Sequence, residues 1–248
     1  MHFDLSGKTA LVTGASGGLG AHAARVLAMA GAAVTLGARR EGALSEVVES
    51  IEGEGGTARA ISLDVTDAKS VEAAFAGEAF DIVINNAGVT ATTFAIDLSE
   101  DEWDKILDTN LKGAFLVAQA AAKALKAAGK GGAIVNIASI LGLRVAAGLM
   151  PYAVSKAGLV QMTRATALEW ARFGIRVNAL CPGYIETPLN ADFFATDAGK
   201  AMIKRIPQRR LGQESDLDGA LLLLCSDAGA YITGAELAVD GGHLVSSL

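Results

Sequence analysis

Ser139, Tyr152 and Lys156 bring a hydroxyl, a phenol and an ammonium group into one short stretch of the chain. Tyr152 and Lys156 are four residues apart, so in a helix that begins near Pro151 they lie on one face, a single turn apart. A phenol titrates near pH ~10, and a cation held close to it moves its pKa toward neutrality. The spacing therefore predicts a tyrosine that acts as a general acid or base.

The neighbouring elements would hold these groups in place. The apolar run 133–138 reads as a buried strand that ends just before Ser139, and Pro151 suits the first turn of the following helix. On their own, the tyrosine and the lysine also fit an ordinary helix with one half-buried and one solvated side chain. The catalytic interpretation therefore depends on whether other motifs in the chain call for a proton donor.

A glycine-rich turn, with the pattern T-G-x-x-x-G-x-G from Thr13, joins a predicted strand at 8–13 to a predicted helix at 21–30. Glycines let the backbone approach a pyrophosphate, and the N-terminus of the helix supplies free N–H groups and partial positive charge. The turn thus predicts a dinucleotide site with contacts from Gly14, Ser16, Gly18, Leu19 and Gly20.

Two other motifs overlap this region. Gly7-Lys8-Thr9 resembles the end of a P-loop, but His2 stands where that motif needs a glycine. The segment 14–18 also satisfies G-x-S-x-G, the nucleophile elbow of hydrolases. A hydrolase remains a remote alternative, because His243 is the only histidine late enough and Ser139, Tyr152 and Lys156 would have no role.

The second predicted strand, 32–37, is followed by Ala38, Arg39 and Arg40. An NAD site places an acidic side chain here to bind the adenosine ribose. A guanidinium would instead pair with the 2′-phosphate of NADP. The pattern favours NADP(H), with Arg39 as the phosphate contact and Arg40 beside it. NAD(H) stays open as the alternative, with Arg39 only stacked on the adenine.

Strands and helices continue to alternate, which predicts an α/β protein with a parallel sheet and ligands at the carboxyl ends of its strands. Asp64 and Val65 follow a strand at 57–63, and Asp64 could accept a hydrogen bond from adenine. Asn86, Ala87 and Gly88 follow a strand at 81–84 and would lie near the nicotinamide ribose. The further elements predicted are helices at 41–53, 67–77, 101–128 (with an interruption near Asn110), 151–173 and 215–226, and strands at 175–180 and 235–239.

Composition excludes several classes of protein. The net charge of −6 opposes a nucleic-acid role, and no apolar run is long enough to cross a membrane. Cys181, Cys225 and the three histidines show no spacing typical of metal ligands. The N-terminus lacks the pattern of a signal peptide, so we expect a cytoplasmic protein without a metal.

Taken in order along the chain, these motifs resemble the short-chain dehydrogenase/reductase family. The match covers nearly all 248 residues and includes the glycine turn, Asn85-Asn86-Ala87-Gly88, Asn110, Ser139, Tyr152-x-x-x-Lys156, Pro182-Gly183 and Asp240-Gly241-Gly242. The resemblance implies one Rossmann domain over residues 1–248 with a doubly wound, seven-stranded parallel sheet. It also implies a homotetramer or a dimer assembled through the helices at 101–128 and 151–173.

The resemblance assigns roles to these residues. Tyr152 would exchange a proton with the oxygen of a carbonyl or secondary alcohol while NADP(H) exchanges hydride with the carbon. Ser139 would hydrogen-bond that oxygen, Lys156 would lower the pKa of Tyr152 and bind the nicotinamide ribose, and Asn110 would anchor a water that returns protons to Lys156. Pro182, Gly183, Ile185 and Thr187 would contact the nicotinamide. Gly17 departs from the family, since many NADP-preferring members carry Arg or Lys there.

Three functions stay open. Apolar residues near the expected pocket and in a substrate loop at about 184–212, among them Leu141, Leu149, Met150, Phe193 and Phe194, favour a ketone reductase or alcohol dehydrogenase. The basic cluster Lys204, Arg205, Arg209 and Arg210 would suit a 3-oxoacyl reductase whose substrate is carried by acyl carrier protein or coenzyme A. A silent cofactor-binding regulator would be expected to lack Tyr152 or Lys156.

Overall fold

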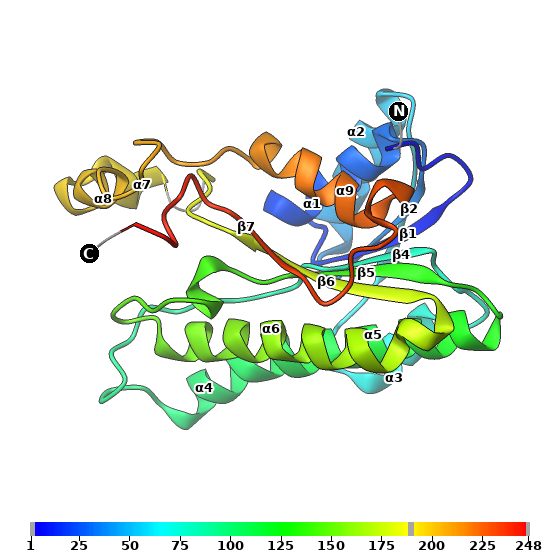
Figure 1. The fold of residues 1–248 in the computed structure, drawn as a ribbon, viewed down its shortest axis with the longest axis horizontal. Coiled ribbons are helices and arrows are strands. Elements are labelled where there is room, and N and C mark those ends of the chain that lie inside the picture. Colours follow the sequence, from blue (N-terminus) through cyan, green and yellow to red (C-terminus); the bar gives the residue numbers. More distant parts are fainter. Residues whose placement is uncertain (1–2, 188–190, 247–248) are drawn as a thin grey trace.

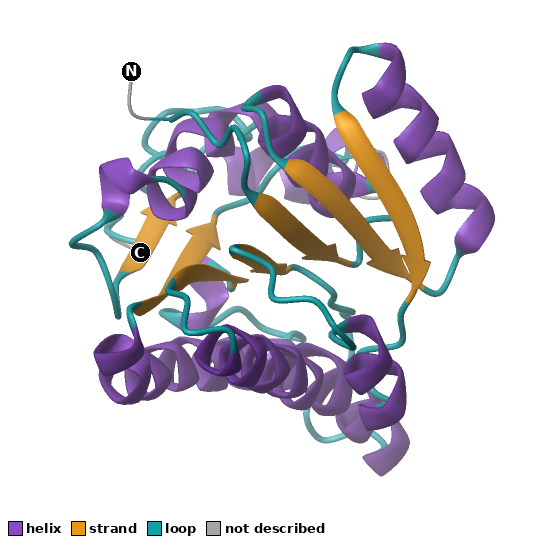
Figure 2. Ribbon diagram, turned by 90° about the vertical axis from the view of Figure 1, so that its right-hand side faces the viewer, coloured by secondary structure: helices purple, strands orange, loops and turns teal. Residues whose placement is uncertain are grey.

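A seven-stranded, entirely parallel sheet forms the centre of the protein (Figures 1 and 2). The computed structural model describes residues 3–187 and 191–246. The strands follow the order β3-β2-β1-β4-β5-β6-β7, which confirms the predicted doubly wound arrangement. Their bounds are β1 Thr9–Thr13, β2 Ala33–Ala38, β3 Thr57–Ser62, β4 Ile82–Asn85, β5 Gly132–Ile137, β6 Ile175–Pro182 and β7 Glu236–Val239.

Helices cover both faces of the sheet (Figure 1). One layer holds α1 (Gly18–Met29), α2 (Glu41–Gly53) and α9 (Asp218–Cys225), and the other holds α3 (Ala68–Ala74), α4 (Glu100–Leu107), α5 (Ala114–Ala127) and α6 (Met150–Trp170). Burial on both faces explains the near-continuous apolar runs of the central strands. In the described part of the chain, no helix has the length and apolar character to span a membrane.

The helix predicted at 101–128 is interrupted at Asn110, as expected. A π-helical turn, Asp108–Gly113, separates α4 from α5 and widens the backbone spiral there. The side-chain amide of Asn110 forms two hydrogen bonds with the backbone of Val89. Its Nδ2 donates to the Val89 oxygen at 2.9 Å, and its Oδ1 accepts from the Val89 nitrogen at 2.7 Å. The polar residue of the apolar stretch thus lies within the π-helical turn and bonds another segment of the chain.

The segment 184–212 contains two short helices where the sequence predicts only a loop. They are α7 (Ala191–Ala195) and α8 (Asp197–Ile203), and the Thr196 hydroxyl caps α8 by accepting a hydrogen bond from the Gly199 nitrogen at 3.1 Å. Each helix spans fewer than two full turns of apolar periodicity, so the sequence pattern did not reveal them. Phe194 of α7 is buried against the body of the protein.

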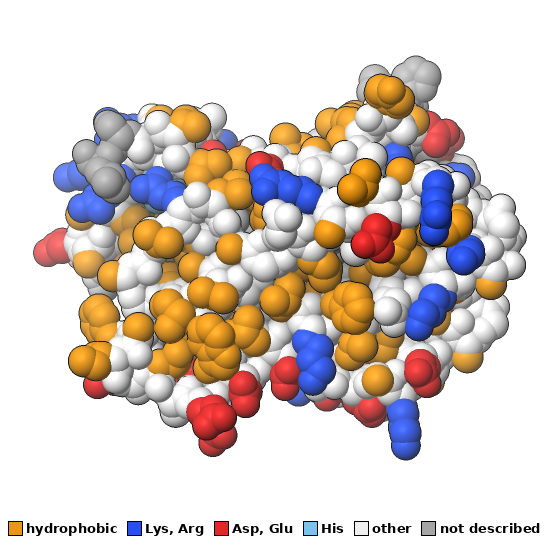
Figure 3. Space-filling view, turned by 60° about the horizontal axis from the view of Figure 1, so that its bottom comes forward, with side chains coloured by type: hydrophobic (Ala, Val, Ile, Leu, Met, Phe, Trp, Pro, Cys, Tyr) orange, Lys and Arg blue, Asp and Glu red, His pale blue; other side chains and the backbone are white. Residues whose placement is uncertain are grey.

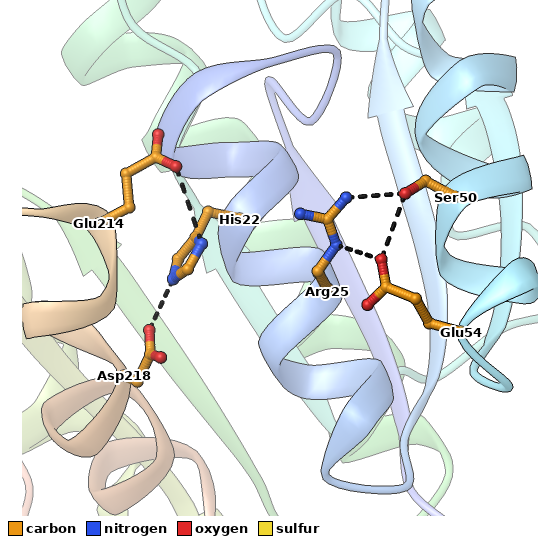
Figure 4. Close-up of polar contacts among 6 residues, drawn as sticks. All are labelled: His22, Arg25, Ser50, Glu54, Glu214 and Asp218. Atoms are coloured by element: carbon orange, nitrogen blue, oxygen red, sulfur yellow. Dashed lines mark hydrogen bonds and ion pairs between the residues drawn. The ribbon is translucent and has the colours of Figure 1, made fainter.

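Polar contacts anchor α1 to the elements beside it (Figure 4). Nε2 of His22 lies 2.6 Å from Oδ1 of Asp218, and its Nδ1 lies 3.7 Å from Glu214. On the opposite side of the helix, Nε of Arg25 lies 3.0 Å from Oε1 of Glu54. The acidic partners of His22 are distant in sequence, so the spacing of the histidines could not predict them. These contacts hold the helix whose N-terminus carries the glycine turn.

Candidate active site

A cleft of about 980 Å³ opens at the carboxyl ends of the strands. It lies where the strand order reverses between β1 and β4, which is the usual ligand site of open parallel sheets. Most predicted site residues line it: Gly14, Ser16, Gly18, Leu19, Arg39, Arg40, Asp64, Val65, Asn86, Ala87, Gly88, Ser139, Tyr152, Lys156, Pro182, Gly183, Ile185 and Thr187. Gly20 and Asn110 do not line the cleft and support it from behind.

The glycine turn packs directly against the end of β4. Gly14 has φ 65, and a Cβ on it would stand 2.8 Å from the Cα of Ala87. Gly20 is packed more tightly still, because its Cβ would lie 2.4 Å from the Gly14 oxygen. The amide of Asn86 fixes the turn by donating to the oxygens of Thr13 and Gly14 at 3.0 and 3.2 Å. Glycine is therefore required at these positions, and the turn fits the close approach of a dinucleotide backbone.

Two arginines border one end of the cleft. Arg40 reaches across the glycine turn, and its Nη2 donates to Oγ of Ser16 at 2.9 Å. Arg39 is largely exposed and its Nη1 lies 3.7 Å from Oδ2 of Asp64. The pKa of Asp64 is lowered chiefly by the backbone hydrogen bond from Thr66, so this carboxylate is charged at neutral pH. Arg39 was the residue predicted from sequence to contact the phosphate, whereas Arg40 is the one bonded to the glycine turn.

Ser139 and Tyr152 meet at the other end of the cleft, with Ser139 at the end of β5 and Tyr152 in the first turn of α6. Burial raises the pKa of Tyr152, and a hydrogen bond from Ser139 works against this increase. The Oγ of Ser139 also accepts a hydrogen bond from the Leu141 nitrogen at 3.1 Å, which orients it. The two hydroxyl groups thus point to the same place, where a carbonyl oxygen can bind.

Lys156 lies one turn below Tyr152 and is buried at the base of the cleft. Its Nζ donates to the Ile137 oxygen at 2.7 Å and stands 5.6 Å from the centre of the Tyr152 ring. Burial lowers the pKa of Lys156 to about 8, close enough to neutrality for the group to gain and lose a proton. Burial is the largest cause of the raised pKa of Tyr152.

The side chain of Asn110 is fully engaged. Besides its two bonds to Val89, its Nδ2 donates to Oγ of Ser155 at 3.1 Å. Ser155 is the neighbour of Lys156 on α6. Gly88 packs close to both side chains, because a Cβ built on it would lie 3.3 Å from Oδ1 of Asn110 and 3.6 Å from Nζ of Lys156. Asn110 therefore joins the loop after β4 to the catalytic helix.

Part of the cleft lining was not predicted from the sequence. Gly17, Leu63, Thr66, Val89, Thr90, Thr109 and Tyr184 also line it, and most are neighbours of predicted residues. The ring of Tyr184 packs edge-on against Phe194, with centroids 5.8 Å apart. Tyr184 follows Pro182-Gly183 directly, so its place after a strand end was the available signal. Leu141 and Leu149 line the cleft as expected, whereas Met150 does not.

Comparison with known proteins identifies the family of the chain. Residues 14–243 match a family model described as enoyl-(acyl carrier protein) reductase. An L-rhamnose 1-dehydrogenase (NAD(P)(+)) of Azotobacter vinelandii is 41% identical over 96% of this chain and 97% of its own. The chain belongs to the short-chain dehydrogenase/reductase family.

Solved structures of this short-chain dehydrogenase/reductase family superpose closely on the protein. A short-chain type dehydrogenase/reductase from Mycobacterium marinum has a TM-score of 0.91, 40% identity and 97% coverage of both chains. A gluconate 5-dehydrogenase from Burkholderia cenocepacia, in complex with NADP and tartrate, has a TM-score of 0.94 and 36% identity, with coverage of 99% of this chain and 98% of its own. The protein is therefore an NAD(P)-dependent oxidoreductase that acts on alcohol or carbonyl groups.

Proposed function

We propose that the protein interconverts a secondary alcohol and a ketone in a small polyhydroxylated molecule, with NADP(H) as the cofactor. The observation that carries this proposal is the convergence of Ser139 and Tyr152 above buried Lys156 at one end of a dinucleotide cleft. The sugar and sugar-acid dehydrogenases among its relatives support the substrate class. At the opposite end of the cleft, the guanidinium of Arg40, hydrogen-bonded to Ser16, supports the choice of NADP(H).

The catalytic side chains divide the proton chemistry between them. When bound, the nicotinamide supplies or accepts hydride at the reacting carbon. Tyr152 gives a proton to the carbonyl oxygen in reduction and takes it back in oxidation, while Ser139 hydrogen-bonds the same oxygen. Lys156, with a pKa of about 8, can hold the proton that Tyr152 exchanges. Asn110 keeps the loop at Val89 and Gly88 against α6, so that these groups stay aligned.

Arg40 and Ser16 form the proposed 2′-phosphate site, and Arg39 adds charge beside it. No acidic residue stands at Ala38, where an NAD site would place one. A guanidinium and a hydroxyl 2.9 Å apart present donors that suit a phosphate.

Replacing Arg40 with Ala is expected to weaken NADPH binding about tenfold or more and to leave NADH binding within about twofold, because only NADPH carries the phosphate. Fluorescence titration with both cofactors measures this, followed by turnover of a panel of sugars and sugar acids. Arg172→Ala, at the far end of the sheet, is the matched control. Equal losses for both cofactors would contradict the phosphate assignment.

The tethered-acyl alternative has less support. Of its four basic residues, Arg210 is already paired with Asp216, through two hydrogen bonds to the carboxylate. This pairing removes charge from the surface that a phosphorylated carrier would bind.

We also propose that the face formed by α4, α5 and α6 pairs with a second copy of the chain, as a dimer or as part of a tetramer. Hydrophobic side chains gather over this face in Figure 3, and the exposed apolar residues Phe115, Val154 and Leu168 belong to α5 and α6. Helices that present large apolar residues to water are typical of subunit interfaces.

Phe115→Glu is expected to shift the protein toward a smaller species in size-exclusion chromatography with light scattering, because a buried charge would have no partner. Tyr231→Glu changes an exposed aromatic residue outside these helices and should preserve the α4–α6 dimer. An unchanged mass for Phe115→Glu would argue against this interface.

A further inference from the structure

One histidine of the protein is buried behind the substrate end of the cleft and has no role in the proposed reaction. His243 is only 7% exposed, and its ring packs against that of the cleft residue Tyr184 with centroids 5.4 Å apart. Within residues 3–187 and 191–246, Nδ1 of His243 is a buried polar atom with no hydrogen-bond partner. A polar group left in this state has a cost, so its place behind the cleft wall suggests a function.

Arg144 holds this region together. It follows Ser139 by five residues, is half-buried, and donates from Nη1 to the main-chain oxygen of His243. No carboxylate of the described residues lies within ion-pair distance of it. Its other nitrogens are not buried, so they can still bind a ligand. A half-buried guanidinium without an acidic partner is an available anion site.

The surrounding charge is also positive. Asp240 is the nearby acid, and its two carboxylate oxygens already accept hydrogen bonds from the nitrogens of Gly242 and Leu244. The pKa of His243 is lowered by burial first and then by the charge of Arg144, with Arg205 acting in the same direction and Asp240 against it. The charge of Arg144 also reaches the phenol of Tyr184.

The lining of the cleft contains no acid at this end. Asp64 is the only acidic residue among the described residues that line the cleft, and it stands beside Arg39 at the opposite end. The substrate end is formed by neutral side chains such as Leu149 and Tyr184, with Arg144 just behind them. An anionic group would therefore be drawn to this end.

We infer that Arg144 binds a carboxylate of the substrate, remote from the reacting carbon, so that the preferred substrates are hydroxy acids and keto acids and not neutral sugars. The planar guanidinium can present two N–H groups to a carboxylate. This inference rests on the proposed function, since it names the substrate class of the same site. Arg144 is then a specificity-determining residue and takes no part in proton transfer.

Calorimetry on the NADP⁺-loaded enzyme tests the inference with two ligands, L-tartrate and L-threitol. They share the same four-carbon diol, and the two carboxylates of tartrate are replaced by hydroxymethyl groups in threitol. The wild type should bind tartrate more tightly than threitol. In Arg144→Gln the dissociation constant for tartrate should rise about tenfold or more, while that for threitol changes by less than about twofold. Arg144→Lys should retain part of the preference, because it keeps the charge.

Arg172→Gln serves as the control for a general loss of positive charge and should bind tartrate as the wild type does. Arg144 also fixes the turn at His243, so a purely structural role would weaken tartrate and threitol alike, and that result would overturn the inference. So would a wild type that does not prefer tartrate. Failure of the proposed function would appear differently, as absence of NADP⁺ binding in the titration that precedes the addition of tartrate.

Discussion

Replacing Tyr152 with Phe is expected to lower the rate of turnover by a factor of about 10²–10⁴, because it removes the proton donor and little else. The ring of Tyr152 would still fill its place on α6, and the cofactor cleft extends far beyond it. NADPH binding should therefore stay within about twofold of wild type. Steady-state rates of NADPH loss and a fluorescence titration on the same preparation give the two numbers.

The matched control is Tyr231→Phe, since Tyr231 is fully exposed and lies outside the cleft. It loses the same oxygen atom and should behave as wild type in both measurements. If Tyr152→Phe kept most of its rate, the proton would have to come from another group, and Ser139 above Lys156 would be the next candidate. A simultaneous loss of NADPH affinity would show instead that the variant had disturbed the cleft.

The second large effect is expected at Gly20. A methyl group there would stand 2.4 Å from the Gly14 oxygen and 2.5 Å from Nδ2 of Asn86, closer than real contacts allow. Gly20→Ala must therefore push the glycine turn away from β4. We expect a loss of stability of about 1–3 kcal/mol and NADPH binding weakened about tenfold or more. Denaturant unfolding and cofactor titration measure the two effects.

Gly17→Ala is the control within the same turn. Gly17 has extended backbone, with φ 161, and its Cβ would meet only the tip of the Arg40 side chain at 3.9 Å. This variant should fold and bind the cofactor nearly as wild type does. Wild-type behaviour of Gly20→Ala would mean that the turn does not need its close contact with Asn86.

The features that were predictable from sequence are those that depend on residues close together in the chain. Strands buried on both faces read as apolar runs, the glycine turn lies between a strand and a helix, and Tyr152 and Lys156 are one helical turn apart. Asn110 was expected to interrupt its helix because an amide in an apolar stretch conflicts with burial. Each signal extends over fewer than about 30 residues. The alternation of strands and helices predicts a parallel sheet, whereas its doubly wound arrangement was implied by the family resemblance.

Contacts between distant segments were not predictable in the same way. Whether Arg39 or Arg40 turns toward Ser16 depends on side-chain direction at the end of β2, which the sequence pattern does not contain. The bond from Lys156 to the Ile137 oxygen, the pairing of His22 with Asp218, and the contact of Arg144 with His243 each join separate elements. α7 and α8 were missed because they are too short to show periodicity.

The π-helical turn at Asp108–Gly113 touches both walls of the cofactor cleft. At one end of the cleft, Gly113 packs against Val65, where a Cβ would lie 2.8 Å from the Val65 side chain. The side-chain amide of Asn110 holds Val89, and Thr109, the residue before Asn110, lines the cleft itself. Six consecutive residues thus contact two of the segments that line the cleft. A change in this one turn would therefore reach two separate segments of the cofactor cleft at once, the one at Val65 and the one at Val89.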